Sequence, residues 1–461
     1  MSGNRVKSQE LRVKNDTALG GRSFRGEKVW VVLVACVLVI VPFHAFLTVW
    51  ASTVLGHYTL LRLWPECGML LLSMWFFASR QFARVWQDLN KFHLGWPILL
   101  YLVLAILYFG AAVVHAKVGL QAAGYGLLLA TRPVVWFVLV YTVASRSVWL
   151  KQHWQSLILI PLMLVVLFAL LQFFVLPADF LKHFGYIKDV TIAPAQTINQ
   201  DTSTMRAQSF LRGPNPLGAY VVLGIGLVYA SGISRARKWG LLVASFGALF
   251  ISFSRSAWLG LVVVAMAWFA VRRGIYRGGK QILAVLAGFL LVLFVLLGLL
   301  QVNEGAKTAL LHVNDNSTAQ QTSNEGRLSA LRSGASDVLR EPLGRGPGTA
   351  GPASVYNYSG GQRNSENYFL GIGQEFGWLG LGLFVLICYR LAGTLYRQKD
   401  PFAHAIFAIF VGLSFINLLS YAWSDSTLAY TWWGIAAVAL APFGGVRVSA
   451  RKHVKAQKYE H

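Results

Sequence analysis

Long apolar stretches recur along almost the whole chain and are separated by short segments rich in lysine and arginine. Most of these stretches have about the 20 residues that an α-helix needs to cross a bilayer. Charged residues make up only 13% of the chain, against about 25% in an ordinary soluble domain. The pattern therefore predicts an all-α polytopic membrane protein with about 12 transmembrane helices. The candidate helices are residues 29–50, 58–78, 94–115, 120–145, 154–175, 214–233, 239–253, 257–271, 282–301, 367–389, 403–423 and 427–445.

Lysine and arginine are concentrated on every second connection between the candidate helices. If the N-terminal tail is cytoplasmic, the cytoplasmic segments contain 27 of the 41 basic residues but only 6 of the 18 acidic residues. Basic residues favour the cytoplasmic side of a membrane in this way. The asymmetry therefore predicts that both termini are cytoplasmic. It also accounts for the net charge of +23 without a nucleic-acid partner.

One polar segment, residues 302–366, interrupts the succession of apolar stretches and is predicted to lie on the outer side. A carrier needs no such segment, whereas an enzyme that acts on a lipid-anchored substrate at the membrane surface does. We therefore expect the functional residues in this large loop, which should carry short helices, and among the arginines that face it. The predicted division of the chain is a basic tail (1–28), nine helices with an outer loop at 176–214 (29–301), the large outer loop (302–366), three helices (367–445) and a second basic tail (446–461).

Two arginines are predicted to lie within or at the end of apolar stretches. Arg255 lies in Ser254-Arg255-Ser256, between two short candidate helices. A charge held at that depth costs about 3 kcal/mol or more unless it is paired or hydrated, which makes Arg255 a candidate functional residue. The alternative is that its side chain extends to the lipid headgroups. Arg132 has Glu66 as a candidate partner, and this pair could be a structural ion pair or part of a substrate site.

The first outer loop ends in Arg206-Ala-Gln-Ser-Phe-Leu-Arg212-Gly-Pro-Asn215-Pro. Its glycine and prolines predict a turn that leads into a helix, with Asn215 as the N-cap. The two arginines are therefore expected at the outer surface, next to this turn.

The large loop contains Arg327 on a predicted helix, followed by Gly344-Arg345-Gly346-Pro-Gly348. Glycines allow a tight loop whose exposed backbone N–H groups can closely approach phosphate oxygens. The alternative is that these glycines serve only to turn the chain.

Metal-binding patterns are missing from the sequence. Cys36, Cys67 and Cys388 all lie in apolar stretches without paired spacing, so they indicate neither disulfides nor a metal site. No cluster of histidine, cysteine and carboxylate residues has ligand spacing. We therefore expect no metal and no cofactor. His44, near the end of an apolar stretch, is expected to be an interfacial side chain rather than a base.

Taken in order, five segments of this chain resemble motifs of the O-antigen ligase / Wzy-type polymerase superfamily. The segments are Arg206…Phe210…Gly213-Pro-Asn215, Ser254-Arg255-Ser-Ala-Trp258, Gly326-Arg327, Pro342-Leu-Gly-Arg-Gly-Pro-Gly348 and Asn367-Tyr-Phe-Leu…Glu375-Phe-Gly377-Trp-Leu-Gly380. Members of the superfamily transfer glycans from undecaprenyl pyrophosphate at the outer face of the bacterial inner membrane. The resemblance implies a metal-independent inverting glycosyltransferase with a periplasmic active site.

The resemblance also implies roles for individual residues. In the family pattern, an arginine before the Gly-Pro-Asn turn and the arginine of the Ser-Arg motif hold the pyrophosphate, and these correspond to Arg206 and Arg255. Both are expected to be catalytic, because guanidinium groups match phosphate bidentately and stay charged. The expected substrate-binding residues are Arg132, Arg212, Asn215, Arg327, Arg345 and Asn367.

The sequence departs from the family pattern at Glu366-Asn367, where ligases usually have His-Asn. A carboxylate at residue 366 can accept the proton of the acceptor hydroxyl, so Glu366 is the third expected catalytic residue. The alternative is that Glu366 is only a favourable charge at the N-terminus of a helix. The missing histidine favours a polymerase over a ligase.

The resulting prediction is a membrane glycosyltransferase that polymerises undecaprenyl-pyrophosphate-linked repeat units of O-antigen, capsule or exopolysaccharide. The first alternative is an O-antigen ligase that transfers glycan to lipid A-core, and further alternatives are a small-anion transporter and a non-catalytic scaffold. The implied partners are the undecaprenyl-pyrophosphate-linked donor, a glycan or lipid A-core acceptor, membrane lipids, a flippase and a chain-length regulator.

Overall fold

The structure is a computed structural model that describes residues 28–115, 118–198, 201–273, 318–358 and 362–442. The first half of the described chain is helical, and η marks a 3-10 helix. Its elements are a helix at 28–40, η1 (Val41–Phe43), α2 (His44–Leu55), α3 (Tyr58–Leu61), α4 (Trp64–Ala78), α5 (Phe82–Lys91), α6 (Gly95–Val114), α7 (Leu120–Ala144) and α8 (Trp149–Phe174).

The second half is helical apart from one short antiparallel hairpin, in which Gln196 lies opposite Arg206. Its elements are η2 (Phe180–Phe184), β1 (Gln196–Ile198), β2 (Asp201–Arg206), α9 (Pro214–Ala230), α10 (Arg235–Ile251), α11 (Arg255–Arg273), α14 (Thr318–Arg340), η4 (Gly351–Tyr356), α15 (Tyr368–Arg397), α16 (Pro401–Asn417), η5 (Ala422–Ser424) and α17 (Ser426–Leu440).

The prediction of an all-α architecture is confirmed for the described residues. Each candidate helix within them corresponds to a helix or a pair of helices, whereas the candidate at 282–301 lies outside them. Six helical stretches in the described part are long and apolar enough to cross a membrane. They are Lys28–Leu55, Gly95–Val114, Leu120–Ala144, Trp149–Phe174, Arg255–Arg272 and Tyr368–Arg397. The total of 12 spans stays a prediction.

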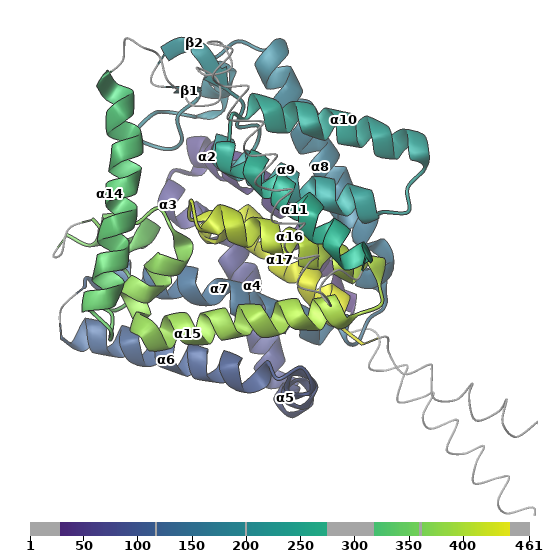
Figure 1. Cartoon of the computed structure of the whole chain (residues 1–461), viewed down its shortest axis with the longest axis vertical. Helices are drawn as coiled ribbons and strands as arrows, with labels where there is room; N and C mark the ends of the chain where they lie inside the picture. The colour runs from purple at the N-terminus through teal and green to yellow at the C-terminus, as the bar shows by residue number, and fades with distance from the viewer. Residues whose placement is uncertain (1–27, 116–117, 199–200, 274–317, 359–361, 443–461) are drawn as a thin grey trace, which may run out of the picture.

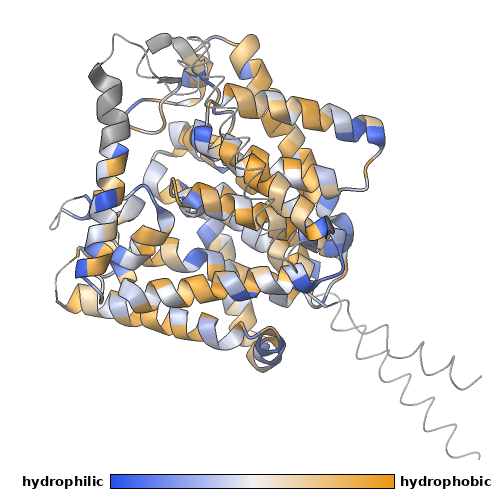
Figure 2. Cartoon of the chain, viewed as in Figure 1, coloured by the Kyte–Doolittle hydropathy of each residue, from blue (hydrophilic) through white to orange (hydrophobic). Residues whose placement is uncertain are grey.

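Apolar residues make up most of the helices, as Figure 2 shows by the orange colour along α6 and α15, and many of them are exposed. Phe77 is 71% exposed and Leu107 is 64% exposed. A helix that is apolar all round needs an apolar environment on every side. The outward apolar surface therefore fits contact with lipid.

The interior of the bundle is built around α17, which packs against α7, while α16 packs against α9 and α11 (Figure 1). Trp423, Trp432 and Trp433 are fully buried there, and the amide of Trp423 donates to Asn417 Oδ1 at 2.9 Å. This aromatic cluster fixes η5 and the N-terminus of α17. It thereby positions the polar residues Ser424 and Asp425, which line a pocket described below.

Helix α14 stands apart from the interior, at the left of Figure 1, and packs against α15 at its lower end. It contains the expected site residue Arg327 on an exposed face. The hairpin of β1 and β2 lies near the top of the same view, and it ends at Arg206. Segments that are far apart in the sequence can therefore meet between α14, the hairpin and the ends of α9 and α11.

Candidate functional site

Arg206 is held in place by three oxygen acceptors at the end of β2. Its Nε donates to the carbonyl of Ser252 at 3.0 Å, and its Nη2 donates to Asn215 Oδ1 at 2.9 Å and to the carbonyl of Phe253 at 3.3 Å. Phe253 has a left-handed backbone with φ of +48°, a strained conformation for a non-glycine residue. The strained turn fixes the guanidinium before any substrate arrives. Among the described residues, these bonds leave Nη1 for another acceptor.

Arg255 begins α11, two residues after that strained turn. Gly218 lets α9 approach the same place, because a Cβ at residue 218 would lie 2.7 Å from Ala257 Cβ and 2.8 Å from Ser254 Cβ. Asn215, in the first turn of α9, is thereby brought next to the start of α11. The N-cap of α9 is Gly213, so the prediction that Asn215 caps this helix is wrong. Its side chain orients Arg206 instead.

Arg327 and Glu366 form an ion pair between α14 and the segment before α15. The distance from Arg327 Nε to Glu366 Oε2 is 3.0 Å, and the two side chains are 49% and 38% exposed. Glu366 has φ of +49°, which is again a costly conformation for a residue with a side chain. The preceding residue is anchored, because Ser365 Oγ lies 2.8 Å from the hydroxyl of Tyr421. The carboxylate is therefore presented from a constrained backbone.

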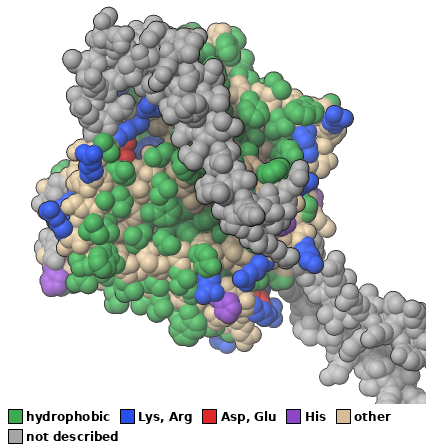
Figure 3. All heavy atoms as spheres, in the orientation of Figure 1, with side chains coloured by type: hydrophobic (Ala, Val, Ile, Leu, Met, Phe, Trp, Pro, Cys, Tyr) green, Lys and Arg blue, Asp and Glu red, His purple; other side chains and the backbone are tan. Residues whose placement is uncertain are grey.

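Arg206, Arg255 and Arg327 lie near enough to one another for their charges to interact, and we call this group the triple-arginine site. Burial, and then the charges of Arg327 and Arg255, lower the pKa of Arg206 to about 10. The group stays protonated at neutral pH. Three like charges held together favour an anionic ligand. Figure 3 shows lysine and arginine side chains, with an acidic side chain, beside a recess at the upper left of this face.

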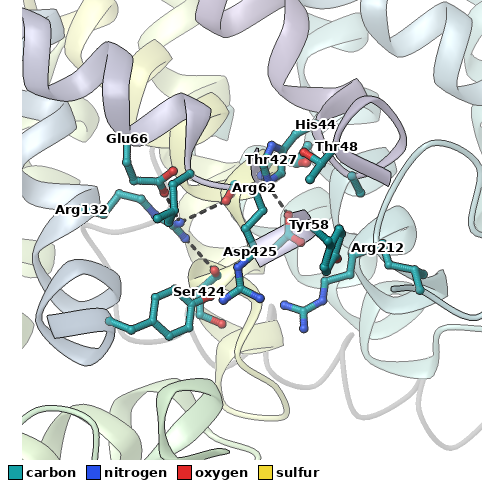
Figure 4. Close-up of a pocket in the computed structure, with 15 residues that line it drawn as sticks. His44, Thr48, Tyr58, Arg62, Glu66, Arg132, Arg212, Ser424, Asp425 and Thr427 are labelled. Atoms are coloured by element: carbon teal, nitrogen blue, oxygen red, sulfur yellow. Dashed lines mark hydrogen bonds and ion pairs between the residues drawn. The ribbon is translucent and has the colours of Figure 1, made fainter. Parts of the chain in front are cut away.

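A second group of charges surrounds a small cavity, which we call the inner pocket (Figure 4). Its volume is about 40 Å³. The charged residues lining the pocket are Arg62, Glu66, Arg132, Arg212 and Asp425. They come from four separate segments of the chain, and Figure 4 shows the three arginines converging on one region. Arg212 therefore lies in the inner pocket, although it is only six residues from Arg206.

Arg132 is the most deeply buried of these residues, with 2% of its surface exposed. Its Nη1 donates to Glu66 Oε1 and to Ser426 Oγ, both at 3.0 Å, and its Nη2 donates to the carbonyl of Ser424 at 2.6 Å. The ion pair expected from the sequence is present. Because the pair also lines a cavity, the structural and the substrate-binding interpretations are compatible.

The other two arginines of the inner pocket are more accessible. The guanidinium of Arg62 lies over the ring of Tyr125, 4.7 Å from its centroid, and Arg212 is exposed. Asp425 caps α17 by accepting from the amides of Thr427 and Leu428. Burial raises the pKa of the Asp425 carboxyl, and the charges of Arg212 and Arg132 oppose this effect.

A hydrogen-bonded segment connects the inner pocket with Glu366. The carbonyl of Ser424 accepts from Arg132, and the Oγ of Ser424 donates to the carbonyl of Tyr421 at 2.7 Å. The hydroxyl of Tyr421 in turn bonds Ser365, the neighbour of Glu366. The two charged regions are therefore fixed relative to each other by η5.

The glycine loop at residues 344–348 does not present free backbone N–H groups to a ligand. The amides of Arg345 and Gly346 donate to the carbonyls of residues 374 and 375, and the amide of Gly348 donates to Glu375 Oε1 at 2.8 Å. Residues 346–348 are buried. Of the two interpretations of these glycines, the structure supports the one in which they turn the chain, because these amides already donate to other residues of the protein.

The glycines are required because the loop packs closely against the backbone of α7 and α15. Gly348 has φ of +84°, and a Cβ there would lie 2.3 Å from the carbonyl oxygen of Ala122. A Cβ on Gly344 would lie 2.4 Å from the amide nitrogen of Gly377, where α15 is broken by a φ of +65°. The loop thus holds α15 at its break. Only glycine allows both the left-handed conformation and the close approach.

Two further expected substrate residues have contacts within the protein. Asn367 caps α15, where its Oδ1 accepts from the amide of Leu370 at 3.0 Å and its Nδ2 donates to the carbonyl of Leu418 at 3.1 Å. Arg345 forms an ion pair with Glu341. It follows the C-terminal end of α14, about 20 Å along that helix from Arg327. The structure therefore separates Arg345 from the triple-arginine site and explains Asn367 as a cap.

Comparison with known proteins shows which family this chain resembles. Residues 240–385 match the family model described as O-antigen ligase. An O-antigen polymerase of Salmonella muenchen is 24% identical over 274 residues, which cover 58% of this chain and 67% of that protein. The resemblance to the O-antigen ligase / Wzy-type polymerase superfamily is confirmed.

Within this superfamily match, residues 240–385 include Arg255, Arg327 and Glu366, whereas Arg206 precedes them. The charged residues of the inner pocket all lie outside the matched range. Together with the six long apolar helices, the match identifies a multi-pass membrane protein. Within the described ranges, no group of three or more histidine, cysteine or carboxylate side chains could hold a metal. Independence from metals stays a prediction.

Proposed function

We propose that this protein polymerises polysaccharide by transferring a glycan from undecaprenyl pyrophosphate to a second lipid-linked repeat unit. The observation that carries the proposal is the meeting of Arg206, Arg255 and Arg327 with the carboxylate of Glu366. These residues come from β2, α11, α14 and the segment before α15. Such convergence of cations and one carboxylate suits a reaction that needs an anionic leaving group and a base.

In the proposed reaction, the acceptor hydroxyl attacks C1 of the donor sugar while the bond from C1 to the diphosphate oxygen breaks. Negative charge then grows on the leaving diphosphate. In this proposal the guanidinium groups of Arg206, Arg255 and Arg327 stabilise that charge together. Preorganised donors of this kind contribute about 3–4 kcal/mol each, by analogy with oxyanion-hole donors. Attack from the face opposite the diphosphate inverts the configuration at C1.

Glu366 takes the proton of the acceptor hydroxyl in this scheme. Its carboxylate pairs with Arg327 in the resting protein, and both side chains are accessible. A bound diphosphate competes for Arg327 and so releases the carboxylate toward the acceptor. This arrangement supplies a base where ligases usually have histidine.

A ligase is the second candidate, because the family model that matches residues 240–385 is described as O-antigen ligase. The same donor site would then serve a lipid A-core acceptor. We place both reactions at the periplasmic face of the inner membrane, with both termini cytoplasmic and residues 302–366 outside. The excess of basic residues on alternate connections supports this orientation.

The test uses purified protein in liposomes with an undecaprenyl-pyrophosphate-linked repeat unit, and products are read by gel electrophoresis and mass spectrometry. A ladder of lengthening lipid-linked glycans is the expected result. Transfer to added lipid A-core without a ladder would establish the ligase instead. If a correct repeat unit gave neither product, the assignment as a glycan transferase would be refuted.

A further inference from the structure

The inner pocket carries an excess of one positive charge. The triple-arginine site combines three arginines with the carboxylate of Glu366, which pairs with Arg327. The inner pocket also has three arginines but contains two carboxylates, Glu66 and Asp425, which gives a formal charge of +1. A diphosphate that links a lipid to a sugar has two negative charges, one more than the inner pocket can neutralise. The inner pocket matches a singly charged anion.

Two further observations indicate that the inner pocket receives a ligand. Arg132 is 98% buried and lines the pocket, yet its Nε has no hydrogen-bond acceptor among the described residues. The Nδ1 of His44, Thr48 Oγ1 and Glu66 Oε2, which also belong to residues lining the pocket, have no hydrogen-bond partner there either. The N-terminus of α17 faces the same space, but its amides at Thr427 and Leu428 already donate to Asp425. The buried guanidinium with an unsatisfied N–H is therefore the group that favours an oxyanion.

The size of the cavity restricts this oxyanion to a small group. About 40 Å³ offers room for about three water molecules, which is too little for a sugar ring. The accessible arginines, Arg62 and Arg212, lie nearer the surface than Arg132. The anionic group would therefore enter between them, while the body of its parent molecule stays outside the cavity.

We propose that the inner pocket binds the carboxylate of an acidic sugar in the glycan that this protein handles. This inference rests on the proposed function and names one feature of its substrate. A carboxylate has a single charge and two oxygens, which a guanidinium can bind bidentately. Arg206 and Arg212 are six residues apart, so their Cα atoms are separated by at most about 20 Å. A single oligosaccharide can reach both sites.

The experiment measures binding of methyl glucuronide to the purified full-length protein by NMR titration, with methyl glucoside as the uncharged control. Saturable binding of the glucuronide alone is expected. Arg62→Gln and Arg212→Gln should each weaken it about tenfold or more, because each removes a charged hydrogen bond. Arg340→Gln, at an exposed arginine near the end of α14, is the matched control and should bind normally.

Arg206→Gln separates this inference from the proposed function. This variant should keep glucuronide binding and lose binding of pyrophosphate, used as a probe of the donor site. The inference would be overturned if Arg62→Gln and Arg212→Gln bound glucuronide as tightly as the unaltered protein, or if that protein bound none. Displacement of glucuronide by a lower concentration of dimethyl phosphate would also overturn it, by assigning the pocket to a phosphodiester. None of these results depends on polymer synthesis.

Discussion

Replacing Glu366 with glutamine should affect donor binding and sugar transfer in opposite directions. Glu366 and Arg327 are half-exposed and 3.0 Å apart, and such accessible ion pairs stabilise a protein by at most about 1 kcal/mol. The glutamine variant should therefore fold normally. It also removes the carboxylate that competes with the diphosphate for Arg327. Donor affinity should rise by up to about fivefold, which is the equivalent of 1 kcal/mol.

Transfer by the same variant should fall, because glutamine cannot accept a proton from the acceptor hydroxyl. The loss of a general base typically costs about 10²- to 10⁴-fold in rate. Single-turnover experiments with a fluorescent lipid-linked donor can measure affinity and rate on one sample. Glu366→His should recover part of the rate, since imidazole is a base and histidine is the usual family residue at this position.

Glu341→Gln is the matched control for this experiment. Glu341 also pairs with arginines of the same outer segment, Arg345 and Arg363, but at the other end of α14. Its variant should transfer at the normal rate. The reasoning would be refuted if Glu366→Gln lost affinity and rate to the same extent, which would make Glu366 structural. An unchanged rate would show that the base lies elsewhere.

Three further variants test other parts of the structure. Arg255→Ala should abolish glycan product in the liposome assay while the protein still inserts in membranes, and normal polymer would remove Arg255 from the donor site. Gly348→Ala should lower the free energy of unfolding in detergent by at least about 1–3 kcal/mol because of its left-handed backbone, and the 2.3 Å approach of the new Cβ to the Ala122 carbonyl oxygen adds to this cost. Gly382→Ala, with open space at its Cβ, should be neutral. Arg132→Gln should cost about 3–5 kcal/mol by leaving Glu66 buried without its partner. The double variant with Glu66→Gln should cost clearly less, and equal costs would contradict a coupled pair.

The helices could be predicted from the sequence because the length and apolarity of each stretch determine them locally. The prediction placed a helix at 120–145, and α7 spans Leu120–Ala144. The short helix α5 could not be predicted in the same way, because Phe82–Lys91 is amphipathic and polar and forms no long apolar stretch. Similarly, the candidate at 58–78 is interrupted between α3 and α4, where the sequence gives no strong breaker before Pro65.

The candidate site was predicted less completely, since it depends on contacts between distant segments. Arginines next to apolar stretches were a usable signal, and Arg206, Arg255 and Arg327 do meet. Arg62 and Asp425 were missed because each is an isolated charge whose partners come from other elements. For the glycine loop the sequence left two interpretations open for the same reason. Glycine indicates close approach of backbone, but the sequence does not tell whether the approaching group is phosphate or the protein's own α15.

The triple-arginine site is also energetically different from the buried pair of Arg132 and Glu66. The pKa of Arg206 falls from its usual range to about 10 in the folded protein, so the fold disfavours its charged form at every pH below about 10. The resting protein therefore bears a cost at neutral pH, which the carbonyls of Ser252 and Phe253 help to offset. Arg132 has its own counter-charge and bears no such imbalance. A cost of this kind is expected where the substrate supplies the missing negative charge, and it supports the proposal that the diphosphate binds at Arg206 rather than at Arg132.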